Sequence, residues 1–326
     1  MKKEIKRIAV FTSGGDAPGM NAAVRAVVRT ADYNDLHVYG IYEGYNGMIN
    51  GKIERLNKRD VANIIHSGGT KLKTARCLPF KTVEGRELAY QTLSAHDIDA
   101  CVAIGGDGTY TGAKVFTETY EIPFVGLPGT IDNDIYGTDY TIGFDTAVNT
   151  AVEAIDKIRD TADSHNRLFF IEVMGRHAGY IGLHTGIGTG AGGIFIPETD
   201  TDLDQFVDQL QRSSRRKKLF NMVVVAEGNQ NGNAMEIATY IKEKHGIESK
   251  VTIIGHLQRG GSPSAFDRVL ASRLGYNAVM ALLDGKSNVA LGLVNNSVVH
   301  TPFEDAITKS KALNQDLVHM AKILAM

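Results

Sequence analysis

One stretch decides the fold: Val102-Ala-Ile-Gly-Gly-Asp-Gly-Thr-Tyr-Thr-Gly-Ala-Lys114. An apolar run that ends in glycine is typical of a strand buried in a parallel sheet, and glycine allows a tight turn into the next helix. The turn carries Asp107 at a place where a nucleotide-binding loop would be expected to carry a lysine. The stretch therefore predicts a strand–turn–helix unit with a carboxylate at the turn.

Apolar runs of this kind recur along the chain, and helical patterns lie between them. Strands are expected at residues 8–11, 37–42, 100–104, 124–127, 168–173, 193–196, 222–226 and 251–254. Within residues 146–160, apolar side chains recur at spacings of three and four, as on one face of a helix. The alternation predicts an α/β fold of two doubly wound, three-layer α/β/α (Rossmann-like) domains with mainly parallel sheets, divided near Gly143.

Two stretches fit this pattern less well. Residues 180–193 are so rich in glycine that local propensity predicts a loop, although small residues would also permit close packing of a buried helix. The charged segment 212–218 is expected to be an exposed helix end or loop.

Composition limits the class of protein. The 326 residues carry a net charge of −2, so no strong field points to nucleic acid or a membrane surface. The apolar runs are far shorter than the roughly 18 residues that span a bilayer, and a cytoplasmic protein is expected. Cys77 and Cys101 match no disulfide or zinc pattern and are expected to be free thiols.

Glycine turns follow two of the expected strands. The first is Thr12-Ser-Gly-Gly-Asp-Ala-Pro-Gly-Met-Asn21, and the second is Gly105-Gly-Asp-Gly-Thr109. Each alone is equally well explained as a tight strand-to-helix turn, but two in one sheet indicate a phosphate site. Neither is a Walker or dinucleotide motif. A carboxylate such as Asp107 suits Mg²⁺, which takes one or two carboxylates together with phosphate oxygens.

A pair of acids follows another strand, in Leu127-Pro-Gly-Thr-Ile-Asp-Asn-Asp134. In an extended stretch Asp132 and Asp134 would point the same way, and they could orient and deprotonate a hydroxyl. The alternative is a turn with two solvated acids. Arg176 and Arg259 follow other strand ends. The planar guanidinium group of arginine is a fork of N–H donors that can bind two oxygens of one phosphate. His256 is a second candidate base, but the favoured interpretation is a hydrogen-bonded histidine at a strand end, because an aspartate already serves the hydroxyl.

Five motifs together resemble the bacterial type of ATP-dependent 6-phosphofructokinase over essentially the whole chain. They are Ser13-Gly-Gly-Asp-Ala-Pro-Gly-Met-Asn21, Gly105-Gly-Asp-Gly-Thr109, Pro128-Gly-Thr-Ile-Asp-Asn-Asp-Ile135, Met174-Gly-Arg176 and Gly255-His-Leu-Gln-Arg-Gly-Gly-Ser-Pro263. The resemblance implies a homotetramer that transfers the γ-phosphate of ATP to the 1-hydroxyl of fructose 6-phosphate. It also implies an ATP-binding domain at 1–143 plus about 258–308, and a sugar-phosphate and oligomerisation domain at 144–257 plus about 309–326.

The resemblance also implies roles for individual residues. The ATP site would comprise Gly15, Tyr45 near the base, Arg76, Cys77, Gly106, Asp107 serving Mg²⁺, Gly108 and Thr109. Asp132 would be the catalytic base, supported by Thr130 and Asp134, with Arg176 stabilising the moving phosphoryl group. The sugar phosphate would contact Thr130, Asp132, Met174, Gly175, Arg176, Glu227, His256 and Arg259, with Arg167 and Lys250 reaching it from a neighbouring subunit.

The chain departs from the family pattern at several positions. Lys250 stands where arginine is usual and loses the bidentate fork, so weaker sugar-phosphate binding is expected. The basic wall of an allosteric site is matched by Arg25, Arg29, Arg159, Arg216 and Lys218. Asn63, Gly192 and Phe220 replace an aspartate, a glutamate and a histidine there, so weak or altered effector responses are expected.

Three rival functions remain. A pyrophosphate-dependent phosphofructokinase shares the fold, but Gly108 and Gly129 stand where such enzymes tend to carry an acid and a lysine. Lipid and NAD kinases share Gly-Gly-Asp-Gly-Thr but lack the Thr-Ile-Asp-Asn-Asp segment. A non-catalytic nucleotide sensor would not need both Asp132 and Arg176.

Overall fold

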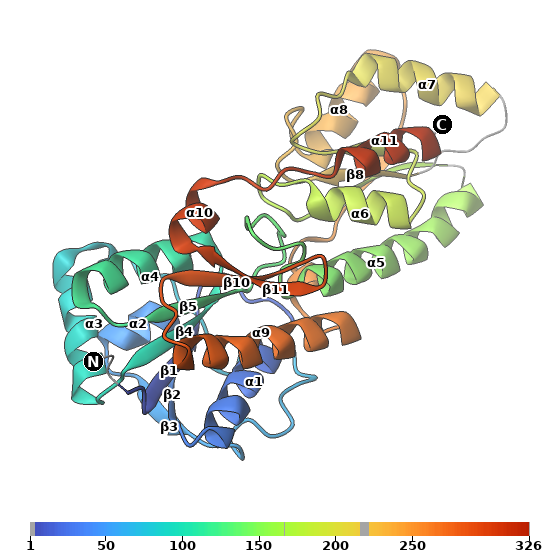
Figure 1. Ribbon diagram of the computed structural model, residues 1–326. Helices are drawn as coiled ribbons and strands as arrows, with labels where there is room; N and C mark the ends of the chain where they lie inside the picture. Colours follow the sequence, from blue (N-terminus) through green and yellow to red (C-terminus); the bar gives the residue numbers. More distant parts are fainter. Residues whose placement is uncertain (1–3, 166, 216–221, 326) are drawn as a thin grey trace. The chain divides into compact units, whose positions relative to one another are not determined.

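The computed structural model describes residues 4–165, 167–215 and 222–325 (Figure 1). The chain forms two compact units. The first unit comprises the residues up to Ile131, residues 135–146 and Arg259–Lys311. The second unit comprises Asp132–Asp134, Ala147–Gln258 and the residues from Ala312 onward.

The first unit is built on a seven-stranded sheet in the order β11-β10-β5-β4-β1-β2-β3. The strands are β1 (Arg7–Thr12), β2 (His37–Ile41), β3 (Ile53–Leu56), β4 (Ala100–Gly105), β5 (Phe124–Pro128), β10 (Val289–Val294) and β11 (Ser297–Pro302). The five inner strands are parallel, and the edge strands β3 and β11 are antiparallel to their neighbours. Every residue of β4 is buried, as its continuous apolar run predicts.

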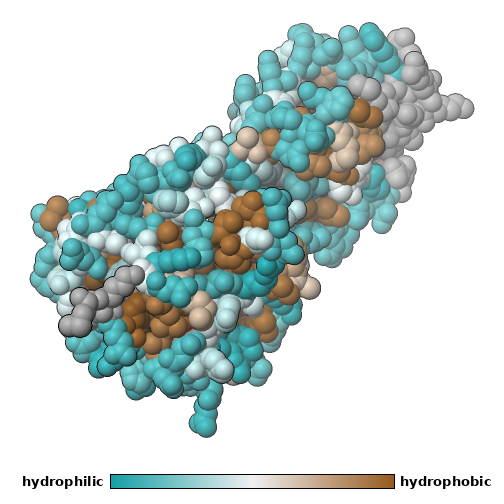
Figure 2. Space-filling model, viewed as in Figure 1, coloured by the Kyte–Doolittle hydropathy of each residue, from teal (hydrophilic) through white to brown (hydrophobic). Residues whose placement is uncertain are grey.

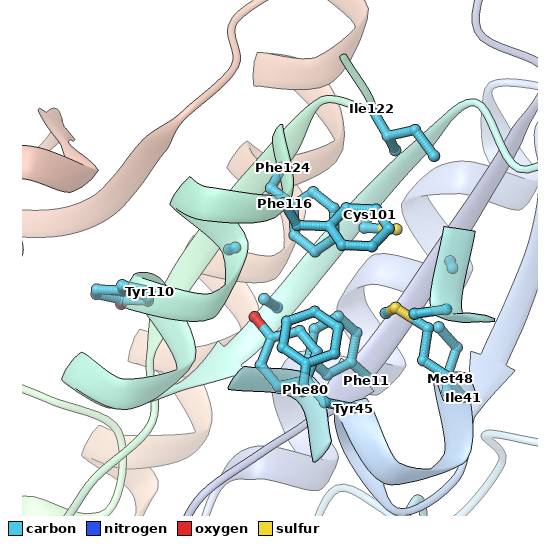
Figure 3. Close-up of a cluster of buried hydrophobic side chains, with 14 of the residues drawn as sticks. Phe11, Ile41, Tyr45, Met48, Phe80, Cys101, Tyr110, Phe116, Ile122 and Phe124 are labelled. Atoms are coloured by element: carbon cyan, nitrogen blue, oxygen red, sulfur yellow. The ribbon is translucent and has the colours of Figure 1, made fainter. Parts of the chain in front are cut away.

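Helices cover both faces of this sheet. They are α1 (Met20–Tyr33), α2 (Gly44–Ile49), α3 (Val83–Ala95), α4 (Asp107–Tyr120), α9 (Ala265–Leu283) and α10 (Phe303–Thr308). Figure 1 shows α1 and α9 side by side on one face, with α3 and α4 on the other. An aromatic cluster that includes Phe11, Phe80, Phe116 and Phe124 fills the space under α2, α3 and α4 (Figure 3).

The second unit has a four-stranded parallel sheet in the order β7-β8-β6-β9. Its strands are β6 (Leu168–Val173), β7 (Gly193–Phe195), β8 (Met222–Ala226) and β9 (Ser249–Ile253). Its helices are α5 (Phe144–His165), whose first residues belong to the first unit, α6 (Tyr180–Gly188), α7 (Leu203–Arg215), α8 (Ala234–His245) and α11 (Gln315–Leu324). Side chains of α7 and α8 pack on one face of the sheet, and α6 and α11 lie on the other.

The predicted fold class is confirmed, because each unit is a mainly parallel sheet between two helical layers. The eight expected strands are observed to within two residues, and the helix expected at 146–160 is the centre of α5. The described part of segment 212–218 is the end of α7, and the rest lies outside the described residues. Cys77 and Cys101 are free, and Cys101 is fully buried.

The loop predicted at residues 180–193 is wrong, because residues 180–188 form helix α6. A Cβ atom on Gly186 would lie 2.4 Å from the side chain of Ile194, and one on Gly182 would lie 3.2 Å from Ile196. These glycines let the helix pack directly on β7 and the residue that follows it. Tertiary packing therefore outweighs the low helix propensity of glycine.

The surface seen in Figure 2 is mostly hydrophilic, with hydrophobic side chains in separate patches. Such a mixture is ordinary for a folded protein surface. Among the helices that the structure describes, none is long and apolar enough to cross a membrane.

Candidate active site

Two glycine turns of the first unit meet at the carboxyl ends of β1 and β4. The peptide N–H of Ser13 donates to the carbonyl of Ile104 at 2.9 Å. A Cβ atom on Gly105 would lie 2.5 Å from the Ser13 carbonyl oxygen, and Gly14 has a φ of +86°. Only glycine allows this close approach of the two backbones. The two turns predicted to bind phosphate are therefore adjacent.

The second turn leads directly into the 14-residue helix α4, with Gly106 before its first residue. Added Cβ atoms on Gly106 and Gly108 would meet nothing within 4 Å, and Asp107 is exposed. The peptide N–H groups in the first turn of a helix have no helical acceptors, and they attract anions. This end of α4 therefore has the open space that the predicted phosphate site requires.

Tyr45 contacts this end of α4 from the hydrophobic core of the first unit. It is 6% exposed, and its hydroxyl donates to the carbonyl of Thr109 at 2.6 Å. Its ring stacks on Phe80 with 3.9 Å between ring centroids (Figure 3), and burial raises the pKa of the hydroxyl well above its ordinary value. Tyr45 therefore positions α4 from within the core. Of the other predicted nucleotide ligands, Arg76 is exposed and Cys77 is half-buried.

Arg259 lies against the first glycine turn. Its guanidinium donates to the Asp16 carbonyl at 3.1 Å, and a Cβ atom on Gly15 would lie 2.6 Å from the same nitrogen. Arg259 belongs to the first unit, whereas His256 is an exposed residue of the second unit. The structure thus places a cation beside the first glycine turn, in the same unit as Thr130 and in a different unit from His256.

The acidic pair has a different geometry from the one its sequence predicts. The expectation of an extended stretch is wrong, because Asn133 has a φ of +57°, a left-handed conformation that asparagine tolerates. Asp132 is 2% exposed and Asp134 is half-buried. Thr130, also half-buried, follows the bridge between Gly129 and Ile142 in the first unit.

Asp132 faces an arginine within the second unit. Its Oδ2 lies 3.6 Å from Nε of Arg176, whose side chain is 62% exposed. A buried carboxylate next to an exposed guanidinium can accept a proton on one side and hold a mobile phosphoryl group on the other. The structure therefore brings together two of the predicted catalytic residues.

The backbone around Arg176 is tightly constrained. Arg176 has a φ of +53°, and a Cβ atom on Gly228 would lie 1.8 Å from the Arg176 carbonyl oxygen. Oε1 of Glu227 accepts from the N–H of Arg176 at 2.7 Å and from that of Gly175 at 3.4 Å. Glu227, predicted to bind sugar, thus also holds the turn that carries the arginine.

A residue that the sequence did not indicate completes this turn. Gln258 is fully buried, and its Oε1 accepts from the peptide N–H of Met174 at 2.8 Å. The available signal was its place between His256 and Arg259 in a predicted binding motif. Such a signal cannot reveal a buried role for the side chain.

Arg167 and Lys250 lie at the opposite edge of the small sheet. Lys250 is the second residue of β9 and is paired with Phe169 at the start of β6, which Arg167 precedes. Arg176 and Glu227 follow the other ends of parallel strands, roughly 13 Å away at about 3.3 Å per residue. The two basic residues are therefore not brought to the site of their own chain.

The predicted effector residues are placed only in part. Arg25 and Arg29 lie one turn apart on α1, and Arg159 on α5 donates to the carbonyl of Thr189. Arg216, Lys218 and Phe220 lie outside the described residues.

These features define an α/β protein with two adjacent glycine turns at a helix end in one unit and an acid–arginine pair in the other. The family model for phosphofructokinase matches residues 7–282. The chain is 54% identical to an ATP-dependent 6-phosphofructokinase of Bacillus pumilus, over 98% of this chain and 100% of that one. It is 56% identical to ATP-dependent 6-phosphofructokinase 1 of Thermus thermophilus, over 99% of this chain and 100% of that one.

A solved structure agrees with these matches. Phosphofructokinase from Saccharomyces cerevisiae superposes with a TM-score of 0.90 at 38% identity, covering 98% of this chain. This chain spans 48% of the length of the yeast protein. The chain belongs to the phosphofructokinase family.

Proposed function

We propose that the chain is an ATP-dependent 6-phosphofructokinase, which converts ATP and fructose 6-phosphate to ADP and fructose 1,6-bisphosphate. The observation that carries this proposal is the Asp132–Arg176 pair, in a chain whose other unit offers an open helix end for a nucleotide. The relatives named above bear the same activity in their names.

On the donor side, the phosphates of ATP bind across the two glycine turns and the first turn of α4. Asp107 fits a magnesium ion that arrives with the nucleotide, because it is an exposed carboxylate at the rim of this turn. In the described ranges, no cluster of three or more histidine, cysteine or acidic residues could hold a metal by itself. Magnesium neutralises phosphate charge when bound, and Arg259 adds a fixed positive charge to the first turn.

On the acceptor side, Asp132 orients the 1-hydroxyl and takes its proton, with Thr130 and Asp134 in support. Arg176 stabilises the charge that develops on the phosphoryl group. Glu227, His256 and the Met174–Gly175 backbone hold the sugar. In-line transfer also requires the γ-phosphate of ATP to reach the 1-hydroxyl of the sugar.

The two basic residues at the far edge of the small sheet act on a neighbouring subunit. Arg167 and Lys250 are both exposed. The predicted sugar-binding residues Arg176 and Glu227 of the same chain follow the other ends of these strands. This placement supports a homotetramer in which subunits share active sites. The substitutions at Asn63, Gly192 and Phe220 support a weak response to effectors.

Pyrophosphate is the less favoured donor. The open space at Gly108 suits the α-phosphate of a nucleotide, which a side chain there would occupy. A Cβ atom on Gly129 would lie 2.9 Å from Cε of Met20 and 3.0 Å from the side chain of Ile104, so a lysine there would require these side chains to shift. Both glycines therefore favour ATP.

A coupled assay that detects fructose 1,6-bisphosphate separates the candidate functions. Purified protein with fructose 6-phosphate and Mg²⁺ should form this product with ATP and much less of it with pyrophosphate. Preference for pyrophosphate, or nucleotide binding without product, would overturn the proposal.

A further inference from the structure

Three consecutive peptide N–H groups are bound by side chains from distant parts of the second unit. The N–H of Met174 donates to Gln258, and those of Gly175 and Arg176 donate to Glu227. These two acceptors lie between 51 and 84 residues away along the chain. These two distant side chains therefore help to hold the turn, in addition to its local hydrogen bond from the N–H of Ala178 to the carbonyl of Gly175 at 2.9 Å.

This turn needs external support because its backbone is unfavourable. Arg176 adopts a left-handed conformation with a φ of +53°, which bulky residues rarely adopt. Its side chain is 62% exposed and meets Asp132 at the long distance of 3.6 Å. The guanidinium is accordingly aimed mainly by the backbone from which it extends.

Gln258 is the fully buried member of this support. Its Oε1 accepts from Met174, and its Nε2 donates to the carbonyl of Ala147 in α5 at 3.3 Å. One partner is a donor and the other an acceptor, so the amide fits in a single orientation. Through one side chain, α5 and the turn after β6 are fixed relative to the segment Gly255–Arg259.

We propose that Gln258 is a positioning residue, which sets the turn Met174–Arg176 so that Arg176 meets the transferring phosphoryl group. The inference rests on the proposed function for its kinetic consequence. Gln258 acts through the Met174 backbone, and both of its hydrogen bonds described above are to residues of the second unit.

The first test compares Gln258→Leu with the matched control Thr138→Val. Thr138 is also a buried side chain that accepts one peptide N–H, from Leu293, and donates to one carbonyl, of Tyr140. It belongs to the first unit, and neither of these two hydrogen bonds involves a predicted site residue. Each variant loses one hydrogen bond from a peptide N–H and one to a peptide carbonyl, so a general loss of stability from such bonds is expected in both.

For Gln258→Leu, kcat should fall by about 10- to 100-fold, the scale of a small misplacement of a catalytic group. The KM for ATP should stay within about twofold of the parent value, because the nucleotide ligands are in the other unit. Thr138→Val should retain the parent kcat. Parent-like kcat in Gln258→Leu, or an equal fall in both variants, would overturn the positioning role.

The second test uses Gln258→Glu, which distinguishes positioning from packing. A protonated carboxyl group has one donor and one acceptor, as glutamine does, whereas an ionised one would set an oxygen against the Ala147 carbonyl. The kcat of Gln258→Glu relative to the parent should therefore rise as the pH is lowered. A ratio that does not change with pH would contradict the proposal.

Hydrogen exchange separates this inference from the proposed function, because it needs no activity. The amides of Met174–Arg176 should exchange at least about tenfold faster in Gln258→Leu and at the parent rate in Thr138→Val. Unchanged exchange in Gln258→Leu would overturn the inference even in an active enzyme. An inactive parent with the expected exchange would overturn the proposed function alone.

Discussion

Asp267 on α9 should make the stability of this protein fall as the pH rises. Its carboxylate is fully buried and accepts from the N–H groups of Gly143 and Thr146, both at 2.9 Å, and from the hydroxyl of Thr146 at 2.5 Å. Burial raises its pKa from 3.8 to about 6, although these three donors lower it, and the nearby Asp145 raises it further. Oδ2 of Asp145 is itself bound by the hydroxyl of Ser264.

The direction and size of the effect follow from this pKa. A carboxyl whose pKa is raised on folding contributes stability that is fully present below its unfolded pKa near 3.8 and is lost as the pH passes 6. A shift of about two units, at about 1.4 kcal/mol per unit, corresponds to about 3 kcal/mol. Most of it, about 2 to 3 kcal/mol, falls between pH 4 and pH 7.5.

Denaturant unfolding of the parent and of Asp267→Asn across this pH range measures the effect. The free energy of unfolding of the parent minus that of the variant should decrease by about 2 to 3 kcal/mol from pH 4 to pH 7.5. Asp208→Asn, which removes an exposed carboxylate of α7, controls for the loss of a charge. A difference that stays constant, or that increases with pH, would refute this reading of Asp267.

Three further predictions concern the active site. Replacing Asp132 with serine should lower kcat by roughly 10² to 10⁴ with little change in sugar affinity, and a kcat within a few-fold of the parent would remove its role as base. Replacing Gly108 with aspartate should leave thermal stability unchanged, because the added side chain meets open space, and should raise the KM for ATP by about tenfold or more; an unchanged KM would contradict the proposed path of the phosphates. Replacing Lys250 with arginine should lower the KM for fructose 6-phosphate by about fivefold, equivalent to about 1 kcal/mol, and an unaltered KM would show that the missing fork is unimportant.

The sequence predicted those parts of the fold in which local pattern and tertiary environment agree. Strands such as β4 and β8 are buried along their whole length and therefore read as continuous apolar runs. Three strands were not predicted. The edge strands β3 and β11 are partly exposed, and in β10 the apolar run is interrupted by Gly292, against which the Gly137 peptide packs.

The candidate site was predictable where its chemistry is carried by backbone turns. The glycines at 15, 106 and 108 mark the turns after β1 and β4, and Asp132 and Arg176 follow other strand ends. Two features depend on long-range contacts that no local pattern encodes: the placement of Arg259 on the Gly15 turn and the buried amide of Gln258. The left-handed conformation of Asn133 was also not predicted.

Product analysis tests the central claim most directly. Parent protein incubated with ATP, Mg²⁺ and fructose 6-phosphate should give fructose 1,6-bisphosphate and ADP in equal amounts by phosphorus NMR, and Asp132→Ser should give almost none in the same time. ADP formed without the bisphosphate, or a phosphate placed elsewhere on the sugar, would contradict the account.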